Sequence, residues 1–490
     1  MSNRINSKGY IINKSTLSKD ELQTLKNDLS ITPKESHMVK AANVKASKPV
    51  IAYRENEKKM YIPRFFGSKR YGDPLISDIK EGDDISVEFS QSLRDYQKDI
   101  VSIYLNYVNK NKSDGVFGGG AILEVPCGRG KTIMALNICS RLKKKTLILV
   151  HKEFLMNQWI DRIRDFLPSA RVGKIQGKTF DIENKDLVIG MIQTMYDKDY
   201  PVNTFASFGL TILDEVHRVG SEEFSKTLLK VVTPFMLGIS ATVERKDGLT
   251  ELLYMFIGPK IYSEEREDTD GVQVRSIHFD HSHEEYKDEE YDFRGNIKYS
   301  TMINKISDFL PRKQFIIKIL FDLILEDSEK QIMVLSHKRD LLDYLEKEIT
   351  SKDFATCGQY VGGMKQERLQ ESETKQIVLA TYAMAAEALD IKTLNTLVMV
   401  SPKTDIVQSV GRILRTKGDG KIIVDIVDSH DVFQNQWKKR RPFYKKCGYT
   451  IKTINSQDYT DMQTISTWTT VYDRNTKQKN EKKKICDLDL

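Results

Sequence analysis

The chain has few cysteines, no long apolar run and no large excess of either charge. Its five cysteines are scattered over 490 residues without a Cys-x-x-Cys pair. This spacing argues against a zinc site and a disulfide framework, and it suits a reducing compartment. No run approaches the roughly 18 apolar residues that cross a bilayer, and the first residues lack the apolar core of a signal peptide. We therefore expect a soluble, intracellular protein without a membrane segment.

The charge balance is close to even. The net charge is +7, with 30% charged and 40% hydrophobic residues, as in an ordinary globular protein. So small an excess supports nucleic-acid binding only where basic residues cluster. Such clusters occur at residues 141–145, 438–441 and 482–484. For any one cluster, a solvated helix end is a more frequent explanation than a nucleic-acid contact.

Residues 1–90 are polar and carry no recognisable motif, and we expect them to form a small accessory domain. Within this region, residues 60–72 interleave aromatic and basic side chains. Two interpretations remain open for this segment. It either contacts nucleic-acid bases and phosphates or forms a hairpin that packs its own aromatic side chains.

From Leu93 onward, short apolar runs alternate with amphipathic segments, a pattern typical of a parallel β-sheet covered by helices on both faces. The pattern predicts two α/β domains, at residues 91–262 and 263–455, and a polar, flexible tail at 456–490. Residues 281–300 are polar and are expected to form a surface loop. The predicted strands lie at 121–125, 146–150, 187–192, 209–213, 235–239, 332–336, 376–380, 396–400 and 421–426.

The most informative segment is residues 126–132, Pro-Cys-Gly-Arg-Gly-Lys-Thr, between a predicted strand and a predicted helix. Gly128 and Gly130 allow backbone N–H groups to surround phosphates, and Lys131 can reach the β and γ oxygens. The Thr132 hydroxyl is a ligand for Mg²⁺. The segment therefore predicts a phosphate-binding loop for ATP and Mg²⁺.

The loop departs from the general Gly-x-x-x-x-Gly-Lys-Ser/Thr form, because Val125 replaces the first glycine. An ordinary glycine-rich turn is the alternative. The remaining loop residues, Cys127 and Arg129, complete the predicted nucleotide site. Cys127 is interpreted as a small filler of the loop rather than a nucleophile.

A second segment argues against the ordinary turn. Residues 209–213 form a short apolar run that would place Asp214 and Glu215 at the end of a buried parallel strand. Asp214 can hold Mg²⁺ there, and Glu215 can polarise the water that attacks the γ-phosphate. Together the two segments predict ATP hydrolysis.

Arg412 and Arg415 can complete this chemistry. Their spacing of three residues places both on one helix face, and guanidinium groups neutralise charge that develops on a transferring phosphoryl group. They belong to the second predicted domain, whereas the predicted Mg²⁺ site belongs to the first. Hydrolysis would then require the two domains to close on one nucleotide, and repeated closure would drive stepping. A basic helix on a solvated face is the alternative.

Four segments share their order with one large enzyme family: residues 126–132, 214–217 (Asp-Glu-Val-His), 240–242 (Ser-Ala-Thr) and 408–415. In this order the chain resembles superfamily-two helicases. Residues 93–97 (Leu-Arg-Asp-Tyr-Gln) and 238–248 resemble the xeroderma pigmentosum-type branch, and residues 427–433 are similar to the poxvirus-type transcript-release helicases of large DNA viruses. The resemblance extends over roughly residues 91–450.

The resemblance implies two tandem RecA-like domains and an ATP-dependent DNA helicase or translocase that moves 3′ to 5′. Its substrate would be double-stranded or branched DNA, bound with little sequence preference; an RNA helicase is the alternative. RNA polymerase or other transcription factors are the protein partners that the resemblance implies. The site residues that it implies are Arg94, Gln97 and Gln408 for the nucleotide, His217, Ser240, Thr242 and Asp390 for coupling between sites, and the loops of His151, Thr194, Ser336 and Thr381 for nucleic acid.

Overall fold

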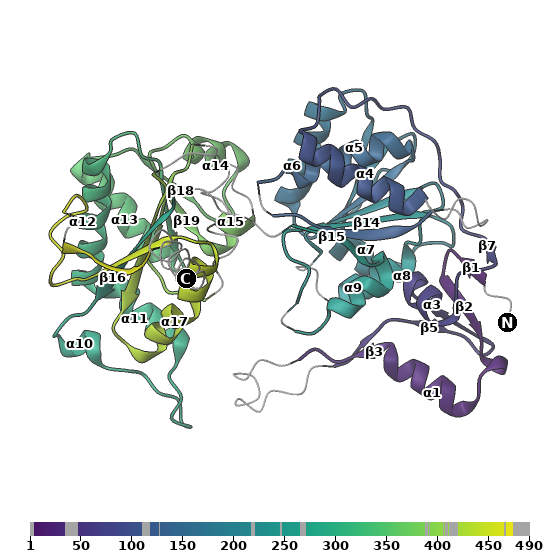
Figure 1. The fold of residues 1–490 in the computed structure, drawn as a ribbon, viewed down its shortest axis with the longest axis horizontal. Coiled ribbons are helices and arrows are strands. Elements are labelled where there is room, and N and C mark those ends of the chain that lie inside the picture. Colours follow the sequence, from purple (N-terminus) through teal and green to yellow (C-terminus); the bar gives the residue numbers. More distant parts are fainter. Residues whose placement is uncertain are drawn as a thin grey trace, which may run out of the picture. The chain divides into compact units, whose positions relative to one another are not determined.

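The computed structural model divides the chain into two compact units, Met1–Glu265 and Arg266–Leu490. Each unit contains one eight-stranded, mostly parallel sheet (Figure 1). The structure describes residues 4–34, 48–109, 118–126, 128–216, 221–245, 247–264, 271–387, 391, 393–404, 406, 410, 420–464 and 467–473.

The sheet of the first unit has the strand order β11-β10-β12-β9-β13-β14-β8-β15. All of its strands run parallel except β11, which pairs antiparallel with β10. Its inner strands are continuous apolar runs because both faces of the sheet are covered. The strands are β8 (Gly120–Glu124), β9 (Thr146–Val150), β10 (Val172–Gln176), β11 (Thr179–Phe180), β12 (Leu187–Met191), β13 (Leu210–Asp214), β14 (Phe235–Ser240) and β15 (Lys260–Ser263).

Helices cover both faces of this sheet (Figure 1). One face packs against α4 (Asp95–Asn109), α5 (Lys131–Leu142) and α6 (Glu153–Phe166). The other face packs against α7 (Ile192–Asp197), α8 (Ser221–Lys230) and α9 (Thr250–Ile257). The helices thus bury two apolar layers and leave the ends of the strands for the connecting loops.

A smaller sheet precedes the first large one, with the strand order β5-β6-β2-β1-β7. It does not have a core of its own, because its buried side chains, such as Tyr10 and Met60, share one cluster with Leu228 and Phe256 of α8 and α9. Its strands are β1 (Arg4–Asn6), β2 (Gly9–Asn13), β5 (Arg54–Glu55), β6 (Lys59–Ile62) and β7 (Ile76–Ser77). The same region contains the helices α1 (Lys19–Asp28) and α3 (Arg64–Tyr71), and a separate two-stranded sheet of β3 (Ser30–Ile31) and β4 (Val50–Ile51).

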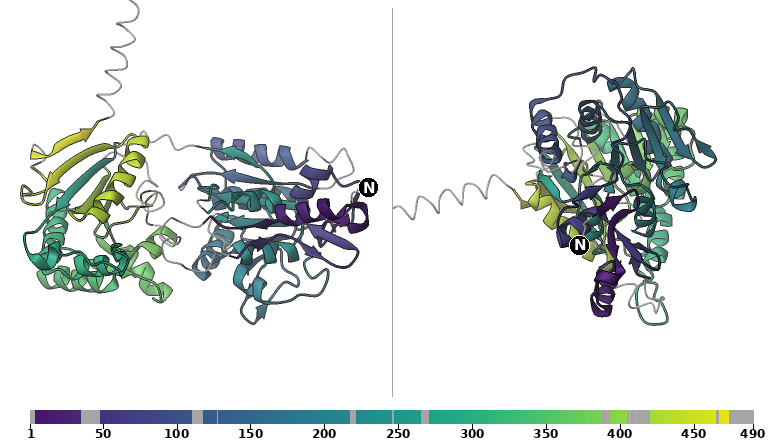
Figure 2. Two further views of the ribbon diagram at one scale, coloured as in Figure 1. Left: turned by 90° about the horizontal axis from the view of Figure 1, so that it is seen from below. Right: turned by 90° about the vertical axis from the view of Figure 1, so that its right-hand side faces the viewer.

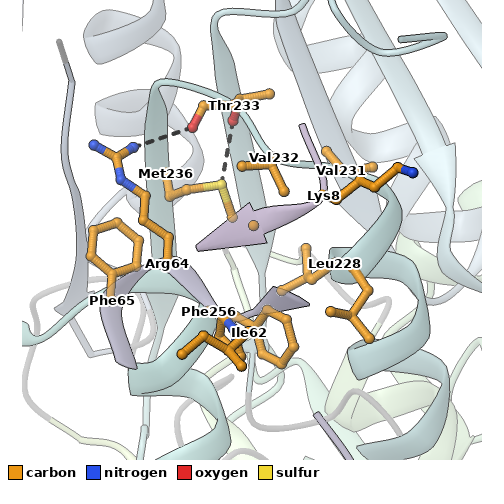
Figure 3. Close-up of a pocket in the computed structure, with 13 residues that line it drawn as sticks. Lys8, Ile62, Arg64, Phe65, Leu228, Val231, Val232, Thr233, Met236 and Phe256 are labelled. Carbon is orange, nitrogen blue, oxygen red and sulfur yellow. Dashed lines mark hydrogen bonds between the residues drawn. The ribbon is translucent and has the colours of Figure 1, made fainter. Parts of the chain in front are cut away.

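The aromatic-basic segment 60–72 begins in β6, which pairs antiparallel with β5, and continues into α3. Ile62, Arg64 and Phe65 of this segment line one pocket (Figure 3). The Arg64 guanidinium is buried and donates hydrogen bonds to the carbonyl oxygens of Pro234 (2.7 Å) and Gly118 (3.3 Å). It also lies 5.2 Å from the centre of the Phe65 ring. This part of the segment therefore fastens the small sheet to the first unit, and it is not free to stack on bases.

The sheet of the second unit has the strand order β18-β19-β17-β20-β21-β16-β22-β23, with only β23 antiparallel to its neighbour. Figure 2 shows the yellow C-terminal strands at one edge of this sheet. The strands are β16 (Gln273–Phe279), β17 (Ile332–Ser336), β18 (Cys357–Tyr360), β19 (Ile377–Thr381), β20 (Thr396–Met399), β21 (Ile422–Asp428), β22 (Thr450–Asn455) and β23 (Thr469–Tyr472).

One large hydrophobic cluster joins this sheet to its helices, with contributions from α11, α12, α13 and α17. The helices are α10 (Glu284–Lys287), α11 (Tyr299–Asp308), α12 (Leu310–Glu326), α13 (Arg339–Lys352), α14 (Gln366–Glu373), α15 (Tyr382–Glu387) and α17 (Asp431–Lys446). No helix among the described residues is long and apolar enough to cross a membrane.

The structure corrects three expectations. The first part of the predicted flexible tail belongs to the fold, since Tyr459, Met462 and Trp468 are buried and β23 extends the sheet. The predicted surface loop 281–300 contains α10, whose Tyr286 is fully buried. Apolar side chains spaced among polar residues anchor both segments, which composition alone does not reveal.

The third correction concerns the basic cluster at 141–145. Lys144 and Lys145 are buried rather than solvated. Lys144 Nζ lies 2.9 Å from a carboxylate oxygen of Asp84, and Lys145 Nζ donates to the carbonyl oxygen of Ile182 at 2.8 Å. Lys144 thus holds the chain segment before the first large sheet, and Lys145 holds the loop after β11, so neither cation is available to nucleic acid.

Candidate active site

The candidate residues of the first unit gather at one edge of its sheet. Strands β8, β13 and β14 run parallel with matched registers, so their carboxyl ends meet. The predicted phosphate loop follows β8, Asp214 is the last residue of β13, and Ser240 is the last residue of β14. This is the edge where open α/β sheets place their ligands.

The phosphate loop has the backbone that its sequence predicts. Gly128 and Gly130 have φ angles of 81° and 80°, in the left-handed region that favours glycine. A Cβ atom on Gly130 would also lie only 2.4 Å from Gln97 Nε2. The loop leads directly into α5, whose first turn directs backbone N–H groups toward any anion held there.

The structure explains the departure at Val125. Its side chain is fully buried, and its backbone N–H donates to the carbonyl oxygen of Ser240 at 2.8 Å. The residue therefore continues the pairing of β8 with β14 and fills the core. A glycine is not needed at this position, because the turn toward the phosphates begins further along the loop.

Gln97 and Tyr96 fasten this loop to α4. Gln97 Nε2 and the Tyr96 hydroxyl both donate to the carbonyl oxygen of Arg129, at 3.0 and 3.2 Å. Gln97 Oε1 accepts the backbone N–H of Arg94 at 3.0 Å. The Arg129 guanidinium lies 3.8 Å from the centre of the Tyr96 ring and 2.6 Å from a Glu264 carboxylate oxygen. These contacts bring the predicted nucleotide residues Arg94, Gln97 and Arg129 together.

Lys131, Asp214 and Glu215 form the charged centre of the site. Lys131 Nζ lies 3.6 Å from Glu215 Oε1. Asp214 is buried, and its Oδ2 accepts a hydrogen bond of 2.9 Å from the indole N–H of Trp159. Burial, together with the neighbouring Glu215 charge, raises the pKa of Asp214 to about 6. A cation beside Asp214 would reverse this shift, as expected of a Mg²⁺ ligand.

Glu215 has a φ angle of 51°, which is uncommon for a residue with a side chain. Such left-handed conformations cost about 1–3 kcal/mol and concentrate at functional sites. The Glu215 backbone N–H donates to the carbonyl oxygen of Ile239 at 3.0 Å, and its Oε2 lies 3.4 Å from Ser240 Oγ. Both contacts come from β14 and hold the carboxylate toward the phosphate loop.

Ser240 also connects this centre to the segment that follows β14. Its hydroxyl lies 2.7 Å from the carbonyl oxygen of Thr242. The next backbone N–H, that of Val243, donates to Glu124 Oε1 at 2.7 Å. A change at Glu215 can thus reach the 240–242 segment through one hydroxyl group, which suits the predicted coupling role of Ser240 and Thr242.

Two site residues were not predicted from the sequence. Trp159 lies on the buried face of α6, where its spacing is indistinguishable from that of core residues. Glu124 ends β8 and accepts hydrogen bonds from Lys260 Nζ and Ser263 Oγ as well as from Val243. Burial raises the pKa of Glu124, but these hydrogen bonds outweigh it and lower the pKa below its usual value. The position of the Glu124 carboxylate just before the phosphate loop was the only feature of the sequence that could have indicated its role.

The residues of the predicted nucleic-acid loops differ in exposure: His151, Thr194 and Thr381 are partly exposed, whereas Ser336 is buried. Thr194 Oγ1 accepts the backbone N–H of Gly177 at 3.0 Å, and the carbonyl oxygen of His151 accepts Gln193 Nε2 at 3.1 Å. In the second unit, Ser336 and Thr381 end β17 and β19. The Ser336 side chain is fully buried, with its hydroxyl 3.2 Å from Ser401 Oγ. It shapes its loop and does not present a hydroxyl to a ligand.

Six predicted site residues lie outside the described part of the chain: Cys127, His217, Asp390, Gln408, Arg412 and Arg415. Within the described residues, no group of three or more His, Cys, Asp or Glu side chains could hold a metal ion. The hydroxyl of Thr132 and the carboxylate of Asp214 fit Mg²⁺ bound mainly through nucleotide phosphates and water.

Comparisons with known proteins identify the family. The family described as "Type III restriction enzyme, res subunit" matches residues 90–245, and "Helicase conserved C-terminal domain" matches residues 314–417. The chain is 33% identical over 466 residues to "Putative ATP-dependent RNA helicase L396" of Acanthamoeba polyphaga mimivirus, covering 92% of this chain and 88% of that relative. The chain belongs to the superfamily-two helicases. As such, it is an ATP-dependent helicase.

Two more distant matches place this helicase among its relatives. It is 28% identical over 315 residues to "DNA 3'-5' translocase XPB2" of Sulfurisphaera tokodaii, which covers 63% of this chain and 62% of the relative. A solved structure of S. cerevisiae Dbp5 bound to RNA and ADP BeF3 matches with a TM-score of 0.52 and 13% identity, over 75% of this chain and 91% of that one. The helicase thus has the expected two tandem RecA-like α/β domains.

Proposed function

We propose that the helicase is a 3′-to-5′ translocase on double-stranded or branched DNA, driven by ATP hydrolysis at the carboxyl edge of its first sheet. The main support for ATP hydrolysis there is that the phosphate loop, Asp214 and Glu215 lie together at that edge. Lys131 and the N-terminus of α5 would bind the phosphates, and Thr132 with Asp214 would hold Mg²⁺. When bound, Mg²⁺ supplies charge neutralisation on the phosphate oxygens.

Glu215 is proposed to accept the proton of the attacking water. In the structure its carboxylate lies beside the Lys131 ammonium. A nucleotide phosphate would draw Lys131 toward its own oxygens and leave Glu215 free to bind water. Ser240 would keep the carboxylate oriented through this exchange. Arg412 and Arg415 are proposed to neutralise the phosphoryl group during transfer, with Gln408 contacting the nucleotide and His217 and Asp390 transmitting its state.

We propose DNA rather than RNA as the substrate because residues 93–97 and 238–248 resemble the xeroderma pigmentosum-type branch. The Sulfurisphaera relative is also named as a DNA translocase. In the second segment, Arg245 pairs with Asp247, and the backbone N–H of Arg245 donates to Thr250 Oγ1. The name of the mimivirus relative favours RNA instead. If DNA is the substrate, we propose a role in viral transcription, replication or repair. The transcription role would include transcript release, with RNA polymerase or other transcription factors as partners.

The deciding experiment measures ATP hydrolysis at one salt concentration with double-stranded DNA, single-stranded DNA and RNA. We expect the strongest stimulation by double-stranded DNA. Strongest stimulation by RNA would overturn the proposal and leave an RNA helicase. Unwinding of substrates with a 3′ or a 5′ single-stranded tail tests direction, and preference for the 5′ tail would exclude the proposed polarity.

A further inference from the structure

A groove beside α17 in the second unit shares no lining residue with the nucleotide site described above. Its lining comes from α17, β16, β22 and β23. We call it the α17 groove, lined by His278, Gln434, Trp437, Lys438, Arg441, Thr453 and Val471. None of these seven side chains carries a carboxylate, so the charge of the groove is positive.

Among the described residues, no carboxylate neutralises the two cations of the α17 groove. Arg441 is partly exposed, and its guanidinium has no hydrogen-bond or ion-pair partner among the described residues. Lys438 Nζ has a neutral neighbour, Asn435 Oδ1, at 3.5 Å. The adjacent Arg440 is different, because it is buried and paired with Asp425 through two contacts of 2.9 Å. The helix therefore uses Arg440 for its own packing and leaves Lys438 and Arg441 for another anion.

The floor of the α17 groove is aromatic. Trp437 is buried, and its ring centre lies 6.1 Å from that of His278 in an edge-to-face arrangement. Burial lowers the pKa of His278, so its ring is neutral at physiological pH. A low-polarity floor strengthens the attraction between the rim cations and a bound anion.

A second polar groove, in the first unit, lacks this unbalanced charge. It contains the carboxylates of Asp83 and Asp186 beside the cations of Lys145 and Arg171. Arg171 lies 2.7 Å from Asp186, and Lys145 lies 4.0 Å from Asp83. Cations that are already paired gain little from a new anion. The comparison singles out the α17 groove as the anion site.

We propose that the α17 groove binds the sugar–phosphate backbone of the nucleic acid on which the motor acts, an inference that rests on the helicase activity. Lys438 and Arg441 lie one helical turn apart, and the exposed Lys445 continues the row. The row spans about 10 Å, long enough to reach about two neighbouring phosphates of one strand. Such contacts do not read bases, so the groove retains the strand without sequence preference.

The test is fluorescence anisotropy without nucleotide, using labelled double-stranded DNA and labelled RNA over a series of salt concentrations. In the double variant Lys438→Gln/Arg441→Gln, we expect about tenfold weaker binding of the preferred polymer at moderate salt, and a salt slope smaller by about 1.4–1.8. ATP turnover at saturating polymer should stay at the wild-type value, because neither residue belongs to the ATP site.

Two matched variants complete the design. Lys287→Gln/Lys347→Gln removes two exposed cations of the same unit outside the groove and should leave the salt slope unchanged. Lys438→Arg/Arg441→Lys keeps the charge and should bind like wild type. Wild-type affinity in the groove variant, or equal losses in both charge-removing variants, would overturn the proposal; wild-type affinity would instead favour an acidic protein as occupant. Failure of the DNA proposal would show separately, as stimulation of the wild-type ATPase by the other polymer.

Discussion

Buried carboxylates at the carboxyl edges of the two sheets have different partners. In the first sheet, Asp214 ends β13, and its side chain accepts a hydrogen bond from the neutral indole of Trp159. In the second sheet, Asp428 ends β21, and its oxygens lie 2.6 and 2.8 Å from the guanidinium nitrogens of Arg312. Both members of this second pair are fully buried.

The difference shows which edge is prepared for a ligand. The Asp428 charge is already neutralised within the fold by Arg312. The Arg312 guanidinium also donates hydrogen bonds to the carbonyl oxygens of Val400 and Ile306. Asp214 instead has a raised pKa, because its charge is poorly compensated. Leaving a buried carboxylate in this state lowers stability, and a divalent cation would restore the balance.

The largest expected effect separates chemistry from binding. Glu215→Gln should slow ATP turnover by about 10²–10⁴-fold, because the amide cannot accept a proton from water. Binding of a fluorescent ATP analogue should persist, since the phosphate loop is unchanged. Phosphate release and analogue binding are measured in parallel, with the exposed Glu251→Gln as control. Near wild-type turnover would remove Glu215 from the mechanism.

The second prediction concerns the buried ion pair between Arg312 and Asp428. Arg312→Met should lower the free energy of unfolding of the second unit by about 3–5 kcal/mol, because it leaves Asp428 buried without its cation. The double variant Arg312→Met/Asp428→Asn should recover part of this loss. Denaturant titration followed by circular dichroism measures both, with the exposed Arg368→Met as control. A loss no greater than that of the control would show that the pair is not essential to the fold.

The third prediction concerns pH. The folded-state pKa of Asp214, about 6, exceeds its ordinary value of 3.8, so the unfolded chain loses this proton first as pH rises. The group therefore reduces stability progressively between about pH 4 and 6 and fully above that range. Without nucleotide, Asp214→Asn should be more stable than wild type at pH 8 by about 1–3 kcal/mol.

At pH 4 the advantage of Asp214→Asn should shrink, while its turnover with Mg²⁺ and ATP should be low at every pH. Thermal melting at both pH values provides the measurement. An equal stability difference at pH 4 and pH 8 would contradict the raised pKa.

The smallest expected effect concerns the hydrogen bond from the Trp159 indole to Asp214. Trp159→Phe removes the donor to Asp214 and should raise the pKa of Asp214 further. The cost in stability is about 1–3 kcal/mol, and turnover should fall more at pH 6.5 than at pH 8. Trp468→Phe is the matched control, because that buried indole N–H has no hydrogen-bond partner in the described part of the chain. Identical pH profiles for the two variants would argue against a role for Trp159 in tuning Asp214.

Most strands were predictable because buried parallel strands are continuous apolar runs. The predicted strands 146–150 and 332–336 coincide with β9 and β17. The central strand β16 was missed, since Arg275, Ser276 and His278 interrupt its apolar pattern. Arg275 is nevertheless buried, because its guanidinium pairs with Glu326 of α12 at 2.7 Å. Sequence-local patterns cannot reveal a charge that is neutralised by a distant element.

The same limit applies to the candidate site. Lys131, Asp214 and Glu215 were recognisable because their chemistry is written in short segments with fixed spacing. The contributions of Trp159 and Glu124 depend on contacts between elements that only the fold brings together. The roles assigned to the second-unit residues 408–415 stay predictions.

The central position of β16 also affects the order in which the chain can fold during synthesis. Its neighbours are β21 and β22, and the first of these begins at Ile422, long after β16 ends at Phe279. At about 5–20 residues per second, a ribosome needs roughly 7–29 s to make the intervening chain. The first unit has all its strands by Ser263 and can fold during this interval. The second unit must wait with an unpaired central strand, which makes it the half more exposed to aggregation and more dependent on chaperones.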